Sequence, residues 1–187
     1  MFIIPEFNPL VKPKVNTSIV TYRGRINSVL DALLVLEATR LELLPTINRR
    51  LTTVERAKYI VPNTIFVWNE TKCGMKRWTD GKLWSPSKVY HGQFLIYKQL
   101  VKFNHQRQVD SNGLIKQSFS LITKQGHRLH LINYFKNTFD RFVSDSESDN
   151  SSEIDSSSTM YPSNDSNLNY LILHSDIYPD NLLLDIP

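Results

Sequence analysis

Cysteine is almost absent from this chain, since Cys73 is the only one among 187 residues. A single cysteine excludes an intrachain disulfide and a cysteine-rich zinc cluster, and it fits a reducing compartment. Long apolar runs are missing too, and none approaches the roughly 20 residues that a membrane helix needs. The N-terminus lacks the basic start and the apolar stretch of a signal peptide, because Pro5 and Glu6 interrupt it. We therefore expect a soluble intracellular protein.

The patterns of catalytic and cofactor sites are also lacking. The chain has neither a glycine-rich phosphate loop nor a Gly-x-Ser-x-Gly elbow. His127 and His130 lie three residues apart in a predicted strand, so their side chains point to opposite faces and cannot bind one metal ion. We expect no catalytic residue, no metal site, no cofactor and no enzymatic activity.

Basic residues are missing from the C-terminal quarter. All 22 Lys and Arg precede position 144, together with nine of the 18 acidic residues, and the other nine acidic residues follow it. Residues 1–143 therefore carry a net charge of +13, and residues 144–187 carry −9. A basic body joined to an acidic, Ser-rich tail predicts a polyanion-binding domain with a solvated or regulatory appendage.

Apolar periodicity predicts one α+β domain. Residues 1–18 contain three prolines and are expected to form an extended arm. A helix is predicted to run from the N-cap Ser28 to Leu43, with Leu33 buried and Glu37 on its wet side, and Thr52 and Glu55 form a capping box for a second helix ending near residue 60. Strands are expected over residues 19–26, 64–68, 93–100, 114–122 and 127–135. This order predicts a single globular domain over residues 19–140, built on a mostly antiparallel sheet.

The acidic tail, residues 144–187, opens with a Ser/Asp/Glu stretch that has no core-forming period, and we expect it to be disordered. Its last twenty residues mix leucines and tyrosines with aspartates. That mixture suits an activation segment or docking peptide that contacts the transcription machinery, or equally a tail that packs on its own domain.

The stretch Gly74 to Lys88 carries the densest functional signal. Asp80-Gly81 favours a two-residue hairpin turn, which would place Arg77 opposite Trp84 with its guanidinium over the indole ring. Trp78, Trp84 and Gly81 would support a stiff cationic projection suited to a nucleic-acid groove, in which arginine contacts bases and lysine contacts phosphate. Ser85, Ser87 and Lys88 add donors for the backbone. Arg49-Arg50 forms a second basic focus before the capping box.

Several motifs occur in an order that resembles the WOPR domain of fungal transcription regulators, over about residues 18–135. They are Thr21-Tyr22-Arg23-Gly24, Arg49-Arg50-Leu51, Phe66-Val67-Trp68, Arg77-Trp78-Thr79-Asp80-Gly81, Trp84-Ser85-Pro86-Ser87 and Gly113-Leu114-Ile115-Lys116. The resemblance implies two boxes, about residues 21–100 and 113–135, interlocked through a shared sheet. It also implies a nuclear regulator that binds specific double-stranded DNA through both grooves. By position, the implied DNA contacts are Arg49, Lys76, Arg77, Thr79, Asp80, Lys82, Lys88 and Lys116.

Thr79 has a second interpretation. Lys76-Arg77-Trp78-Thr79 matches the pattern recognised by a basophilic kinase, and a phosphate there would repel DNA.

Two other functions remain open at the level of sequence. An RNA or single-strand binder would need exposed aromatic residues on an open sheet face, drawn from Trp68, Trp78, Tyr97 and Phe119. A basic protein–protein adaptor would bind acidic partners, including its own tail, in which case removing residues 144–187 should tighten DNA binding.

Overall fold

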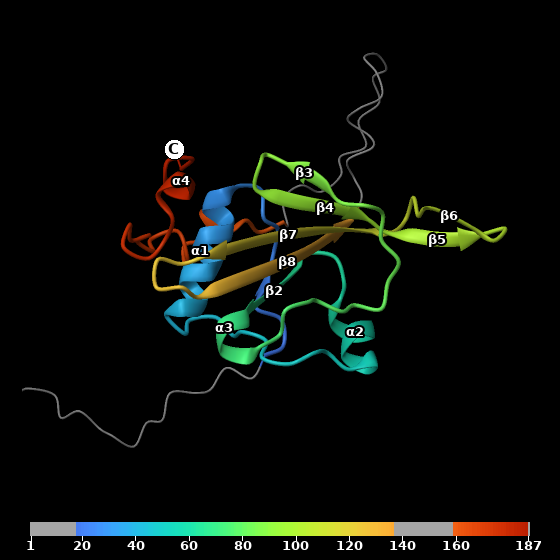
Figure 1. The fold of residues 1–187 in the computed structure, drawn as a ribbon, viewed down its shortest axis with the longest axis horizontal. Helices are drawn as coiled ribbons and strands as arrows, with labels where there is room; N and C mark the ends of the chain where they lie inside the picture. The colour runs from blue at the N-terminus through green and yellow to red at the C-terminus, as the bar shows by residue number, and fades with distance from the viewer. Residues whose placement is uncertain (1–17, 137–158, 187) are drawn as a thin grey trace, which may run out of the picture.

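A six-stranded antiparallel sheet forms the centre of the molecule (Figure 1). The computed structural model describes residues 18–136 and 159–186. Along the sheet the strands follow the order β1-β2-β8-β7-β4-β3. Their bounds are Tyr22–Arg23 for β1, Thr64–Asn69 for β2, Lys88–Tyr90 for β3, Phe94–Lys98 for β4, Leu114–Ile122 for β7 and Arg128–Lys136 for β8.

The two boxes share this sheet. The hairpin of β7 and β8 comes from the second box and lies between β2 and β4 of the first. Neither box can therefore complete its hydrogen-bonded ladder without the other. The predicted α+β domain with a mostly antiparallel, interlocked sheet is confirmed.

Two helices begin where their capping residues predict. Ser28 Oγ accepts a hydrogen bond from Asp31 N at the start of α1, Val29–Arg40. Thr52 and Glu55 cap each other at the start of α2, Thr53–Tyr59. The first helix ends earlier than expected, because Glu42 has a left-handed φ of 59° and Leu43 N turns back to Ala38 O. Among the described residues, three short helices were not predicted: α3, Glu70–Cys73, the 3₁₀ helix η2, Pro162–Asn164, and α4, Asp180–Leu183.

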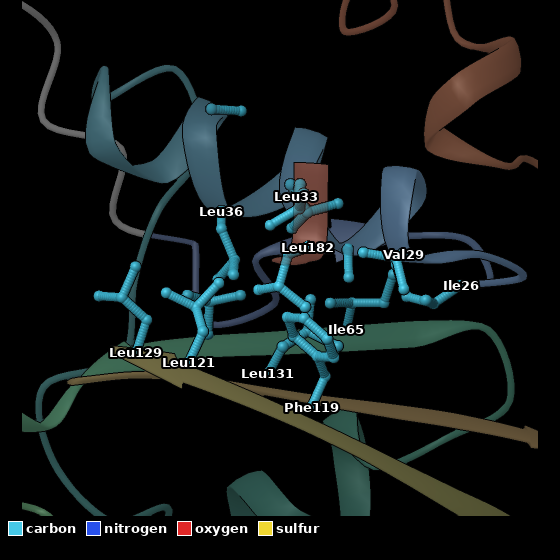
Figure 2. Close-up of a cluster of buried hydrophobic side chains, with 14 of the residues drawn as sticks. Ile26, Val29, Leu33, Leu36, Ile65, Phe119, Leu121, Leu129, Leu131 and Leu182 are labelled. Carbon is cyan, nitrogen blue, oxygen red and sulfur yellow. The ribbon is translucent and has the colours of Figure 1, made fainter. Parts of the chain in front are cut away.

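One face of the sheet packs against α1. Figure 2 shows side chains of α1 such as Val29 and Leu36 above Phe119, Leu129 and Leu131 of β7 and β8. Every residue from Asp31 to Ala38 is buried. A helix lying on a single layer leaves its outer side exposed, so this helix must be covered on two sides.

The second cover is the C-terminal segment, residues 159–186. Leu168, Tyr178 and Leu182 are buried in the same cluster as α1 and the sheet, and Figure 1 shows this segment beside α1. The expectation of a disordered tail is therefore wrong for residues 159–186. Their apolar side chains cover the outer side of α1. Of the two interpretations of the last twenty residues, the structure shows the one in which they pack on their own domain. Residues 144–158, the rest of the acidic tail, lie outside the described residues, as does the arm over residues 1–17.

The same segment shortens the first strand. The expected strand over 19–26 is paired only at Tyr22–Arg23, because Arg25 N donates to Met160 O and Ile26 N to Asn133 Oδ1 instead of continuing the ladder. A Cβ on Gly24 would lie 2.4 Å from Met160 O, so only glycine lets the two backbones approach.

A separate hairpin extends beyond the sheet. Its strands are β5, Leu100–Phe103, and β6, Gln106–Val109, which pair only with each other. In Figure 1 they project past the ends of β4 and β7. In the part of the chain that the structure describes, no helix has the length and apolar character to cross a membrane.

Candidate nucleic-acid interface

The stretch Gly74–Lys88, which we call the basic loop, is anchored on the sheet face opposite α1. That face carries Phe66 and Trp68 of β2 and Ile132 and Tyr134 of β8. Trp68 Nε1 donates to Met75 O at 2.7 Å, at the start of the loop. Trp78 lies on the rings of Phe66 and Trp68, with centroids 5.1 and 5.3 Å away. The loop therefore has an aromatic floor along its first half.

Asp80 fixes the middle of the loop from below. Its carboxylate accepts hydrogen bonds from Tyr134 Oη at 2.6 Å, from Trp84 Nε1 at 2.9 Å and from Lys82 N at 3.1 Å. Lys116 Nζ lies 3.3 Å from the same carboxylate. Trp78 Nε1 donates to Tyr134 Oη at 2.6 Å, so both tryptophans join one network. Asp80 is only 7% exposed, and its side chain therefore faces protein atoms.

This network sets the charge states of its members. Burial alone would raise the pKa of Asp80, but hydrogen bonds from Trp84 and Tyr134 and the charge of Lys116 outweigh it and hold the pKa below its ordinary value. Burial lowers the pKa of Lys116, with partial compensation by Asp80. Burial and the neighbouring carboxylate raise the pKa of Tyr134 above its usual range. Tyr134 therefore stays protonated and donates to Asp80.

The basic loop is not the expected two-residue hairpin. Trp84 forms its bridge with Gln99, and Ser85 exchanges two hydrogen bonds with Lys98, so the second half of the loop runs along the end of β4. The cation over the Trp84 ring is Lys116 Nζ at 4.4 Å, not Arg77. The prediction failed because Asp80, which tolerates a tight turn, instead bonds to residues distant in sequence. Trp78 nevertheless stacks on Trp68 of the sheet, and Trp84 Nε1 donates to Asp80 within the loop.

Gly81 meets two requirements at the bend of the loop. Its φ is +74°, and an added Cβ would lie 3.2 Å from Arg56 Nη1. A side chain here would be strained in its backbone conformation and would crowd Arg56 of α2. Arg56 is thus a cation beside the loop that the sequence patterns did not single out.

A stack of three rings strengthens the floor of the loop. His130 and Trp78 both stack on Trp68, with ring centroids 4.8 and 5.3 Å from its own. His130 is held at both nitrogens, by Ser120 Oγ at 2.7 Å and by Glu70 Oε2 at 2.6 Å. Glu70 thereby links α3 to the aromatic support of the loop.

The two basic foci predicted from the sequence lie together. Arg49 and Arg50 share a surface hollow of about 430 Å³ with Lys76 and Arg77, and no acidic residue lines it. Arg49 makes two hydrogen bonds to Glu55, and these, with one from Thr52 N, lower the pKa of the Glu55 carboxyl to about 2. The guanidinium of Arg49 is therefore held in place by the carboxylate of Glu55. Arg50, Lys76 and Arg77 have no ion-pair partner within the described residues.

The remaining predicted site residues divide by exposure. Lys88 and Ser87 are exposed, while Thr79, Lys82 and Ser85 are half-buried. Lys116 is only 12% exposed at its side chain and, with Asp80, is turned inward. A larger cavity, of about 800 Å³, lies near the C-terminal end of α1 and contains none of the predicted residues. Within the described ranges no cluster of His, Cys, Asp and Glu could hold a metal ion.

Comparison with known proteins identifies the family of this chain. A model of the Gti1/Pac2 family matches residues 21–112. The chain is 33% identical over 211 residues to the cAMP-independent regulatory protein pac2 of Schizosaccharomyces pombe. This alignment covers 86% of this chain and 82% of that protein. It is 50% identical over 84 residues to the transcriptional regulator MIT1 of Saccharomyces cerevisiae, and that alignment covers 45% of this chain but only 12% of MIT1.

Solved structures of other proteins have a similar fold. The structure of the WOPR domain of Wor1 in Candida albicans, in complex with 13-bp double-stranded DNA, matches with a TM-score of 0.65 and 30% identity. That match covers 90% of this chain and 96% of the other. Taken with the near full-length similarity to pac2, it shows that this chain belongs to the Gti1/Pac2 family, whose fold is the WOPR domain.

Proposed function

We propose that this protein is a regulator of transcription of the fungal developmental or nutrient-switch type that binds specific double-stranded DNA. The observation that carries the proposal is the match, over 90% of the chain, to a domain solved with duplex DNA. The basic loop supplies the chemistry. Trp78, Asp80 and Trp84 anchor it to the sheet. Its cations Lys76 and Arg77 are exposed and have no ion-pair partner among the residues that the structure describes. Such a function requires no catalysis, and it operates in the nucleus.

Within this proposal the predicted residues take two different roles. Direct contact with DNA belongs to the exposed and half-exposed members: Arg49, Arg50, Lys76, Arg77, Thr79, Lys82, Ser87 and Lys88. Support belongs to the residues whose polar atoms already bond to protein: Asp80, Ser85 and Lys116 with Trp78, Trp84 and Gly81. Rigid support lowers the entropic cost of ordering the loop on DNA.

Burial of the aromatic residues argues against the single-strand alternative. Trp68 and Phe119 are each 2% exposed, Trp78 is stacked on Trp68, and Tyr97 lies beneath Lys116. A binder that stacks bases needs open ring faces, and the four rings proposed for that role pack against protein atoms. The adaptor alternative makes the acidic stretch 144–158 a partner of the basic body, and it predicts tighter DNA binding when that stretch is neutralised.

Selection from random duplexes, followed by two substitutions, tests the proposal. The selected duplex should compete far better than its separated strands at the same salt concentration. Arg77→Ala should cost about 1–3 kcal/mol of binding free energy and relax base preference. Lys88→Ala, the matched comparison at a phosphate contact, should weaken all sequences alike and reduce the salt slope by about one unit. Equal binding of single strands would contradict the proposal.

Thr79 is proposed as the site of its regulation by a basophilic kinase. It lies half-buried between the exposed Arg77 and the buried Asp80. A phosphate adds nearly two negative charges next to the cations that would meet DNA. Thr79→Glu should therefore reduce DNA affinity by about tenfold or more. Thr79→Val keeps the size of the side chain and adds no charge, so it should lose only the contact of the hydroxyl with DNA, which is a smaller effect. Equal affinity of the folded Glu variant and the parent would refute this role.

We propose that the exposed side chains of the C-terminal segment contact the transcription machinery. Leu168, Tyr178 and Leu182 are used in the core, but Tyr170, Ile172 and Leu184 face solvent. These are the side chains available to a partner.

A further inference from the structure

The β5–β6 hairpin is a separate element with no core of its own. Its strands pair in register from Leu100 with Val109 to Phe103 with Gln106 and make no ladder with the main sheet. All its residues after Leu100 are exposed, including Phe103 at 60%. An isolated two-stranded hairpin is marginally stable in water, so packing within the molecule does not explain why it projects.

The root of the hairpin is tied to the basic loop. Leu100 N donates to Leu83 O at 2.9 Å, and Ser85 N donates to Lys98 O at 2.8 Å. The bridge between Trp84 and Gln99 lies between these two bonds. The hairpin therefore starts at the second half of the loop and extends the same edge of the molecule away from the sheet (Figure 1).

The stretch between Asp80 and Asp110 carries charge of one sign. From Gly81 to Val109 the chain contains five Lys and Arg and no acidic residue. Within the hairpin, Lys102 lies directly opposite Arg107. Like charges in a cross-strand pair destabilise a hairpin, and neither side chain has an ion-pair partner within the described residues. An anion placed between the two would remove this repulsion.

We propose that the β5–β6 hairpin is a second DNA contact, in which Lys102 and Arg107 bind backbone phosphates outside the stretch that the basic loop reads. This proposal rests on the proposed function. Four residues of strand reach roughly 13 Å beyond the loop, which corresponds to about four base pairs of duplex. A contact through phosphate carries no base information. The hairpin should thus lengthen the bound site without changing the preferred sequence.

The full-length chain and two duplexes test this proposal. The long duplex carries the selected site with about eight flanking base pairs on each side, and the short duplex carries the site alone. With the long duplex, the double substitution Lys102→Gln and Arg107→Gln should reduce the salt slope by about 1.8, since each phosphate contact contributes about 0.9. With the short duplex, variant and parent should have the same slope. The selected sequence should stay unchanged.

A matched variant controls for the change in net charge. Lys124→Gln with Arg128→Gln also removes two cations, but at the far end of β7 and β8, where Lys124 pairs with Asp180 and Arg128 with Glu70. This variant should keep the parent slope on both duplexes. Thermal unfolding of the hairpin variant should occur at or slightly above the parent temperature, because the like-charge pair is gone.

Three results would overturn the inference, each for a different reason. An unchanged slope on the long duplex would exclude a phosphate contact by the hairpin and would favour a protein partner for its exposed side chains. An equal loss on both duplexes would place the contact within the site itself. Absence of salt-dependent duplex binding by the parent would overturn the proposed function, and with it the hairpin's role.

Discussion

Asp80 is the residue on which the shape of the basic loop depends. Its buried carboxylate accepts from Tyr134, Trp84 and Lys82 and pairs with Lys116. Removing one partner of a buried ion pair leaves the other charge uncompensated. The loop is thus held by an interaction that is costly to disturb, which suits a surface that must present its cations in a fixed arrangement.

Asp80→Asn should lower the free energy of unfolding by about 3 kcal/mol near neutral pH. The pKa of Asp80 is lowered in the folded protein, so its stabilising contribution is present above the ordinary Asp pKa of about 4 and is lost as the pH falls through the folded value. The difference between parent and variant should therefore shrink below about pH 4. Chemical denaturation at a series of pH values measures it. Asp176→Asn, the same change at an exposed carboxylate, should leave stability unchanged.

At the scale of elements, α1 shows why its surroundings were only half predictable. The pattern of leucines located the helix and its N-cap, and Leu33 and Leu34 are buried as expected. Glu37 was expected on the wet side but is buried, bonded to Arg40 and to Tyr178 Oη. Periodicity describes one face of a helix, and it cannot indicate a covering segment whose Tyr178 is 141 residues away from Glu37.

The candidate nucleic-acid interface was likewise predictable only where the signal in the sequence is local. The sequence indicated the basic loop, the second arginine focus and the supporting tryptophans, because composition and turn residues are local. The shape of the loop was missed, since Asp80 is held by Tyr134 and Lys116, which are far away in sequence. The β5–β6 hairpin was missed too, since its polar, basic strands lack the apolar alternation that marks a half-buried strand.

Tyr178→Phe tests the contact between the C-terminal segment and α1. The change removes the hydroxyl that donates to the buried carboxylate of Glu37, and hydrogen bonds to charged groups are worth about 1.5–3 kcal/mol. The free energy of unfolding should fall by that amount, while the DNA affinity of the folded protein stays constant, because the basic loop lies on the opposite face of the sheet. Tyr170→Phe, in the same segment but exposed, should change neither. A loss of DNA affinity by the Tyr178 variant would contradict this separation of faces.

At the scale of the whole molecule, the basic body and the C-terminal segment share one hydrophobic core. Three side chains of the segment, Leu168, Tyr178 and Leu182, are buried in the central cluster. Each such burial is worth about 1.5–3 kcal/mol, and a typical domain is stable by only about 5–15 kcal/mol in total. The segment therefore supplies a large share of the stability of the domain.

A chain ending at Ser158 should accordingly unfold at a much lower temperature than the full chain, or fail to fold. The autoinhibition hypothesis must then be tested without this truncation, because loss of the core would mask any gain in affinity. Neutralising the acidic residues among positions 144–158 is the cleaner change. Calorimetry of the full chain and of the chain ending at Ser158 measures the loss of stability. A cooperative transition at the same temperature in the truncated chain would show that the segment is dispensable.

The last residues of the chain cover α1 as a separate stretch. Two folded parts of the chain meet in a single core, yet the 22 residues from 137 to 158 join them outside the described structure. Cleavage of the peptide backbone in that interval should leave two polypeptides that remain associated without a covalent bond. Separately produced halves that each carry part of a reporter should then reassemble when mixed, which would make this domain a natural scaffold for fragment complementation.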